Sequence, residues 1–171
     1  MVPVTQIVQR AAQLMQHHFQ ISNVEFKVHF DDEQVTLLCD ENQIQQALVA
    51  LFVNAVEAMP ERGTLSVEVS KKDENKTIRI AITDSGSGIA EEDVTHIFEP
   101  FFTTKKDGKG VGLGLSVVYG IIERHGGDIS VQSGIGKGTT FTLIFPQTDA
   151  KQARQDAGAP EQPVANTTTV S

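Results

Sequence analysis

The sequence predicts an α/β two-layer sandwich, in which a mixed, mostly antiparallel sheet packs against helices. Apolar residues recur about every 3.6 positions in Pro3–Gln20 and in the segment after Asp40, as in amphipathic helices. Elsewhere, as at Ile78, Ile80 and Ile82, they alternate with polar residues, which is typical of strands with one buried face. Helices and hairpins follow one another without strict strand–helix alternation, which favours this layered arrangement over a parallel sheet.

Composition and charge restrict the class of protein. The 171 residues suffice for one domain, and the net charge of −8 argues against general binding to nucleic acid or anionic membranes. Cys39 is the single cysteine, which excludes an internal disulfide and fits a reducing compartment. No apolar run approaches the ~20 residues of a membrane span, and the first residues lack the features of a signal peptide. We therefore expect a cytoplasmic domain without direct membrane contact, and membrane anchoring of a longer parent protein is left open.

The N-terminal half contains two expected helices. The first covers Pro3–Gln20 and is followed by strands at Val24–Phe30 and Val35–Leu38. Asp40 is a suitable N-cap for the second helix, because Gln43 stands three positions later as in a capping box. The apolar face expected for this helix consists of Ile44, Ala47, Leu48, Leu51, Phe52, Ala55 and Met59.

The C-terminal half is expected to form the rest of the sheet. Pro60 and Gly63 end the second helix, and a hairpin near Lys72–Asn75 joins the next two strands. A third helix precedes the last two strands and is closed by Gly126 and Gly127. The expected ranges are strand Thr64–Ser70, strand Thr77–Thr83, helix Leu115–His125, strand Ile129–Ser133 and strand Thr140–Phe145.

The end of the chain differs in composition. Gln147–Ser171 contains no Leu, Ile, Phe or Met, so it buries too little apolar surface to offset its ordering entropy. We expect a folded domain over residues 1–146 and a disordered tail or linker over residues 147–171.

Asp84 is the first candidate site residue. Strand alternation places it on the same side as the isoleucines of its strand, facing the helices, where a carboxylate is costly unless it is paired. It is either a structural cap of the following turn or an acceptor for a donor group of a ligand. Gly86 and Gly88 follow, and two glycines there allow a positive φ or a close approach of the backbone.

Asn54 is the second candidate. It lies at the edge of the apolar face of its helix, one turn after Ala50. An asparagine in this place is either solvated or bonded to the backbone. Beside a nucleotide, its amide oxygen would instead suit Mg²⁺, which prefers oxygen ligands.

A third candidate is the glycine-rich segment Gly108–Ser116, which leads into a helix. Backbone N–H groups at a helix N-terminus can hold phosphate, although a glycine-rich segment is also typical of a plain loop. Lys105, Lys106 and Lys109 add positive charge beside it. The three phenylalanines of Phe98–Phe102 are expected to fold back onto the body or to dock onto a partner.

Together these segments resemble the N, G1, F, G2 and G3 boxes of sensor histidine kinases. The resemblance is to their catalytic, ATP-binding domain, a member of the gyrase–Hsp90–histidine kinase–MutL superfamily with the Bergerat fold. It covers about Pro3–Pro146, and Phe98–Lys105 with His125–Asp128 is most similar to the nitrogen-regulation type. The matching segments are Asn54, Asp84-x-Gly86-x-Gly88, Phe98-x-x-Phe101-Phe102, Gly110-x-Gly112-x-Gly114 and Gly136-x-Gly138-Thr139.

The resemblance implies roles for individual residues. Asp84 would accept from the exocyclic amine of adenine, Asn54 would bind Mg²⁺, and Lys105 would approach the terminal phosphates of ATP or ADP. Residues Ser85–Gly114 would include a mobile lid. The implied catalytic residues are Asn54 and Lys105, and the implied nucleotide-binding residues are Asp84, Gly86, Gly88, Ile89, Thr103, Thr104, Gly110, Gly112, Leu113, Gly114, Leu115 and Thr140.

The resemblance also implies partners. The family passes the γ-phosphoryl group of ATP to a histidine on a separate helical-hairpin dimerisation domain, and from there to an aspartate of a response regulator. None of the histidines here has the sequence setting of that acceptor, so we expect a histidine kinase domain without its own phosphoacceptor. Ala50 stands where hydrolytic relatives carry a glutamate base, which favours transfer over hydrolysis. The alternative is a non-transferring, nucleotide-gated regulatory module of the same fold.

Overall fold

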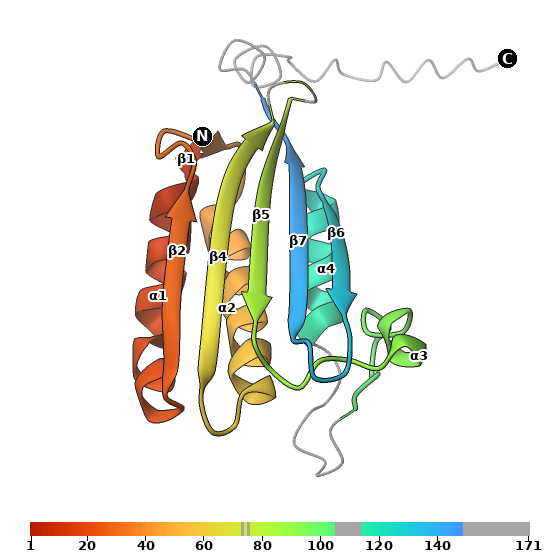
Figure 1. The fold of residues 1–171 in the computed structure, drawn as a ribbon. Helices are drawn as coiled ribbons and strands as arrows, with labels where there is room; N and C mark the ends of the chain where they lie inside the picture. Colours follow the sequence, from red (N-terminus) through yellow and green to blue (C-terminus); the bar gives the residue numbers. More distant parts are fainter. Residues whose placement is uncertain (73, 75, 105–113, 149–171) are drawn as a thin grey trace, which may run out of the picture.

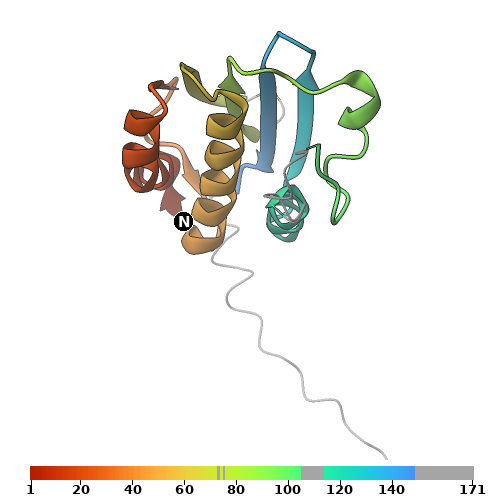
Figure 2. The same cartoon turned by 90° about the horizontal axis from the view of Figure 1, so that it is seen from below.

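Five strands form one mixed sheet, and three helices cover one of its faces. A computed structural model describes residues 1–72, 74, 76–104 and 114–148. The strand order is β2-β4-β5-β7-β6, with β2 parallel to β4 and every other pair antiparallel. Seen along the strands, helices α1, α2 and α4 form a separate layer against the sheet (Figures 1 and 2). The predicted two-layer sandwich is therefore confirmed.

The first helix of the N-terminal half is α1 (Val4–Ile21), which begins and ends within one residue of its predicted range. Its apolar stripe faces α2, as the periodicity indicates. The predicted strand at Val35–Leu38 shortens to β3 (Thr36–Leu37), which pairs with β1 (Val2–Pro3). The strand β1 was not predicted, because two residues carry no detectable alternation. The buried residues of α1 are Val4, Ile7, Val8, Ala11, Met15 and Phe19.

The helix α2 (Glu41–Ala58) begins at the predicted N-cap. The Asp40 carboxylate accepts from the backbone N–H groups of Asn42, at 3.0 Å, and Gln43, at 3.2 Å. In a capping box the side chain of Gln43 would bond the N–H of Asp40. That N–H instead donates to His125 Nε2 at 3.1 Å, while His125 Nδ1 lies 2.7 Å from the carbonyl oxygen of Ile121. The hydrogen bond from the Asp40 N–H to His125, which follows α4, thus replaces the bond that the Gln43 side chain would accept in a capping box.

The central strands match their predicted ranges closely. The strands β2 (Val24–Phe30) and β4 (Gly63–Lys72) run side by side, and β4 forms an antiparallel pair with β5 (Thr77–Asp84). The pair confirms the predicted hairpin, although residues 73 and 75 of its turn lie outside the described residues. The inward-facing residues of β4 and β5 are all buried: Leu65, Val67, Val69, Ile78, Ile80, Ile82 and Asp84.

The helix α4 (Gly114–Arg124) ends where the sequence indicates. The N–H of Gly127 donates to the carbonyl oxygen of Ile122 at 3.0 Å, and that of Gly126 donates to Glu123 at 2.9 Å. This pair of bonds is a Schellman motif, which requires a residue with positive φ, and Gly126 has a φ of +68°. The chain then returns in β6 (Asp128–Ser133) and β7 (Thr139–Pro146).

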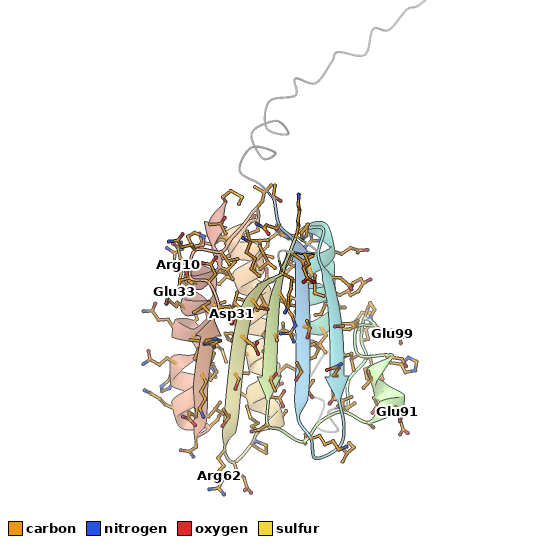
Figure 3. The ribbon with its side chains drawn as sticks, turned by 45° about the horizontal axis from the view of Figure 1, so that its top comes forward. Arg10, Asp31, Glu33, Arg62, Glu91 and Glu99 are labelled. Carbon is orange, nitrogen blue, oxygen red and sulfur yellow. The ribbon has the colours of Figure 1, made fainter. Side chains whose placement is uncertain are left out.

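The segment after β5 contains one helical turn that was not predicted, α3 (Glu91–Val94). Glu91 and Glu99 in this region point away from the sheet (Figure 3). Of the phenylalanines expected to fold back or dock, Phe98 packs on Phe141 of β7 and Phe102 is partly buried, whereas Phe101 is 73% exposed. The fold-back prediction therefore holds for two of the three rings.

The C-terminal boundary remains a prediction. The N–H of Gln147 donates to the carbonyl oxygen of Lys76 at 2.7 Å, which extends the pairing of β7 with β5 by one bond. Residues 149–171 of the expected tail lie outside the described residues. Within the described part, no helix combines the length and apolar character needed to cross a membrane.

Candidate functional site

A cavity of about 500 Å³ opens at one end of the sandwich. It lies where β5 ends and β7 begins, between the C-terminal half of α2 and the first residues of α4. The ends of β5 and α2 and the beginnings of β7 and α4 all lie at the lower end of the sandwich in Figure 1. Ile97 and the three residues Phe102, Thr103 and Thr104 border it on a further side. Its walls therefore come from segments far apart in the sequence, which the topology of the sheet brings to one edge.

Asp84 forms the deep wall of the cavity. It is the last residue of β5, and only 4% of it is exposed. Burial raises the pKa of its carboxyl group, whereas hydrogen bonds from the backbone N–H groups of Gly86 and Thr139 lower that pKa. The Gly86 bond to Oδ1 is 2.8 Å long. The carboxylate is thus held by the backbone and lines the cavity as an acceptor.

The raised pKa predicts a pH dependence of stability. A group with a raised pKa in the folded state contributes stability that is complete below its unfolded pKa and is lost as the pH rises through the folded pKa. We expect the free energy of unfolding of the wild type, relative to that of Asp84→Asn, to increase as the pH is lowered from 7 towards the ordinary value of 3.8. Urea unfolding of both proteins across this range measures it. If the difference in free energy of unfolding between the wild type and Asp84→Asn became smaller as the pH was lowered, the raised pKa would be contradicted.

The helix α2 supplies a second wall. Ala50, Asn54 and Glu57 line the cavity from successive positions on one side of the helix. Asn54 is half-buried, as expected for the edge of the apolar face. Asn54 and Glu57 bring side-chain oxygen atoms to this wall, which are the donors that Mg²⁺ prefers. No group of three or more His, Cys, Asp and Glu side chains among the described residues is arranged to hold a metal.

The loop after β5 is fixed on both sides. The N–H of Ser87 donates to the carbonyl oxygen of Ala58 at 3.1 Å, and the Ser87 carbonyl accepts from Gly136 at 2.8 Å. Gly88 and Ile89 line the cavity, and Gly88 has a φ of +75°. Gly86 packs against the end of α2 and does not line the cavity, so its contribution is the N–H that holds Asp84.

One predicted residue is corrected by the structure. Thr140 does not line the cavity, because its hydroxyl group lies 2.9 Å from that of Thr83 on the opposite, open face of the sheet. Thr139 pairs with Asp84 in the β5–β7 register, is 4% exposed and lines the cavity in its place. The alternation along β7 carried the signal: Phe141 faces the core, so Thr139 shares its side and Thr140 does not.

A further wall of the cavity is formed by the first residues of α4 and by residues that precede α4 in the sequence. Gly114 and Leu115 at the start of α4 line the cavity, as do Thr103 and Thr104. The N-terminus of a helix carries partial positive charge and unpaired N–H groups, so it favours an anion. The predicted residues Lys105, Gly110, Gly112 and Leu113 lie outside the described residues, as does the whole of 105–113 within the segment expected to include the lid.

Several cavity residues were not predicted. Val53 of α2 and the apolar side chains of Ile97 and Phe102 border the cavity beside Thr139. Ser133, at the end of β6, stands just behind Thr139, with 2.8 Å between their hydroxyl oxygens. No local pattern indicates the apolar residues, because Val53 is itself exposed on its helix and Ile97 and Phe102 lie in a segment without regular alternation. The hydroxyl contact depends on the register of β6 with β7.

The family comparison agrees with this geometry. The model of the family described as histidine kinase-, DNA gyrase B- and HSP90-like ATPases matches residues 39–149. The chain belongs to this family. The matched range contains α2, the loop after β5, α4 and the last hairpin, and thus every wall of the cavity.

Individual members of the family are similar over most of the chain. Sporulation kinase E of Bacillus subtilis (strain 168) is 36% identical over 154 residues, or 90% of this chain and 20% of the relative. Sensor histidine kinase ZraS of Escherichia coli (strain K12) is 37% identical over 85% of this chain and 30% of the relative. The chain therefore spans less than a third of either relative. The nitrogen-regulation subtype stays a prediction.

Solved histidine kinase domains share the fold. The nucleotide-free catalytic domain of histidine kinase ThkA is 31% identical, with a TM-score of 0.77 over 86% of this chain and 97% of that domain. ThkA in complex with the response regulator protein TrrA matches with a TM-score of 0.72 at 29% identity, over 85% of this chain and 41% of the ThkA chain. The match thus extends to almost the whole of the ThkA catalytic domain.

Proposed function

We propose that this chain binds ATP with Mg²⁺ and supplies the γ-phosphoryl group to a histidine on a separate dimerisation domain in two-component signalling. One observation carries the proposal: a buried carboxylate, Asp84, and the N-terminus of α4 line the same cavity. The first suits a donor group of a base, and the second suits phosphate. A cavity of about 500 Å³ is within the range of ordinary ligand sites.

On the base side, Asp84 would accept a hydrogen bond from the exocyclic amine of adenine. Gly88, Ile89 and Thr139 flank it in the cavity and would complete the base pocket. The two N–H groups that already hold the carboxylate support this role, because they fix its orientation before a ligand arrives. ADP shares the base and would bind in the same pocket.

On the phosphate side, Gly114 and Leu115 support binding through the start of α4. Thr103 and Thr104 line the same cavity and would lie near the phosphates. By the resemblance, Lys105, Gly110, Gly112 and Leu113 would join them. Asn54 would hold Mg²⁺ through its amide oxygen, and such an ion neutralises charge that develops on the transferred phosphoryl group.

The surroundings of the cavity favour transfer over hydrolysis. Ala50 lines it one turn before Asn54 and has no group that could activate water. All five histidines lie in the described part of the chain, and none lines the cavity. His17, His18 and His29 are exposed, and His96 and His125 hydrogen-bond within the protein. An acceptor supplied by another domain fits these positions.

The ThkA–TrrA complex supports a response regulator as the downstream partner. Together with the acceptor domain, such a regulator would complete a two-component pathway, and the cytoplasm is the compartment in which ATP is available to it. The non-transferring regulatory module remains the second candidate, and it differs only in the absence of phosphoryl transfer.

The substitution Asn54→Ala should weaken Mg²⁺-dependent binding of ATP more than binding without the ion. The amide oxygen serves the ion, whereas the base pocket around Asp84 is untouched. Calorimetry with and without Mg²⁺ measures the two affinities, and Gln46→Ala, an exposed amide on the same helix, is the matched control. An equal loss in both conditions would remove Asn54 from the ion site.

Transfer is tested with radiolabelled ATP. The chain alone should bind ATP and remain unlabelled, because phosphoryl transfer requires an acceptor in line with the γ-phosphate. Adding a separate helical hairpin that carries the cognate acceptor histidine should give slow, acid-labile labelling of the hairpin. Tethering the two should speed transfer by raising the effective concentration. Tight ATP binding with no label on the hairpin would favour the non-transferring module. Label on the isolated chain would contradict the missing acceptor and would point to the exposed His17 or His18.

A further inference from the structure

The Ser133 hydroxyl group connects three segments behind the base side of the cavity. Its Oγ lies 2.8 Å from the backbone nitrogen of Ile89, 2.9 Å from the carbonyl oxygen of Gly138 and 2.8 Å from Thr139 Oγ1. Ile89 and Thr139 line the cavity, whereas Ser133 does not. Ser133 therefore contacts two cavity residues from outside.

The chemistry of these contacts determines where each proton lies. A serine hydroxyl group has one proton to donate and two lone pairs to accept. The Gly138 carbonyl can only accept, so it takes the Ser133 proton. The Ile89 N–H can only donate, so it occupies one lone pair. The remaining lone pair is left for Thr139, whose hydroxyl group therefore donates to Ser133.

This is the arrangement in which all four groups are satisfied. If Ser133 donated to Thr139 instead, the Gly138 carbonyl would lose this donor, and buried polar groups rarely forgo a partner. Among the described residues, every buried side-chain nitrogen or oxygen has a partner. The Thr139 proton is thus committed to Ser133, and Thr139 offers the cavity only its lone pairs.

We propose that Ser133 is a specificity-determining residue that fixes Thr139 as a hydrogen-bond acceptor and so makes the base pocket select a 6-amino purine over a 6-oxo purine. The inference rests on the proposed binding of ATP. Thr139 lies beside the Asp84 carboxylate in the β5–β7 register, so the wall offers two acceptors. With the exocyclic group of the base placed between these two residues, the two protons of a 6-amino group can be donated to the two acceptors, whereas a 6-oxo group meets only lone pairs.

The substitution Ser133→Ala separates this role from simple support of the fold. Without the Ser133 oxygen, the Thr139 hydroxyl group is free to turn its proton towards the cavity and to donate to a 6-oxo group. The Ile89 N–H also loses its acceptor, but that loss affects both purines alike. We expect the preference for ATP over inosine triphosphate to fall about tenfold, the effect of roughly one hydrogen bond.

The test is calorimetric titration of the full chain with ATP and with inosine triphosphate. Ser133→Thr keeps the hydroxyl group and should retain the preference, and Ser130→Ala, an exposed serine on the same strand, should not change it. In a Thr139→Val background, Ser133→Ala should no longer alter the ratio of the two affinities, because the proton that it releases is gone.

The outcomes distinguish this inference from the proposed function. If the wild type prefers ATP and Ser133→Ala weakens both nucleotides equally, Ser133 only supports the fold and the inference is wrong. The inference is also wrong if Ser133→Ala changes the ratio of the ATP and inosine triphosphate affinities by the same factor in the wild type and in the Thr139→Val background. If the wild type binds neither nucleotide, the proposed function fails first.

Discussion

Asparagine in place of Asp84 is expected to lower the affinity for ATP by about ten- to over a hundredfold, since a buried hydrogen bond to a charged acceptor is worth roughly 1.5–3 kcal/mol. The two side chains have nearly the same shape. The Asn Oδ1 can keep the bond from the Gly86 N–H, but its amide group then presents donors to the adenine amine, which is itself a donor. Repulsion thus replaces attraction at the deep wall of the cavity.

Calorimetry with Mg²⁺-ATP measures this loss, and ADP should lose affinity by a similar factor because it shares the base. Asp128→Asn is the matched control, since it removes an exposed carboxylate at the far end of β6 and changes the net charge equally. Circular dichroism establishes that both variants are folded. An unchanged ATP affinity in folded Asp84→Asn would remove Asp84 from adenine recognition.

The position of Asp84 was predictable because it depends on a local rule. Side chains alternate along a strand, so the buried isoleucines of β5 determine where Asp84 points. Asn54 was predictable for the same reason on a helix, where the apolar face of α2 fixes its edge. The cap at Asp40 and the glycine end of α4 also follow from neighbouring residues, and they occur as expected.

The missed features depend on contacts between distant segments. The His125 bond to the Asp40 N–H joins the ends of two helices, and no spacing within either helix indicates it. The pairing of β1 with β3 and the role of Ser133 likewise require the tertiary register. Thr140 is a different case, since only the resemblance implied it, whereas the alternation of β7 places Thr139 and not Thr140 on the side of the buried Phe141.

Gly88→Ala is expected to destabilise the fold by about 2–5 kcal/mol, the sum of a left-handed backbone cost and an overpacking cost. Gly88 has a φ of +75°, and a Cβ built on it would lie 1.9 Å from the carbonyl oxygen of Gly134. The loop after β5 and the loop between β6 and β7 would have to separate. The bonds of Ile89 to Ser133 and of Gly136 to Ser87 cross this contact, so the base side of the cavity should open.

Gly136→Ala separates the two costs. Gly136 has nearly the same φ, +73°, but a Cβ there would meet nothing within 4 Å. It should therefore show only the backbone cost, about 1–2 kcal/mol. Urea unfolding of both variants, with ATP affinity measured under conditions where each is folded, should rank Gly88→Ala as the more harmful in both respects. If the two variants were equally destabilised, the loop after β5 and the loop between β6 and β7 could separate without loss of stability. Their close approach would then not hold the cavity wall in place.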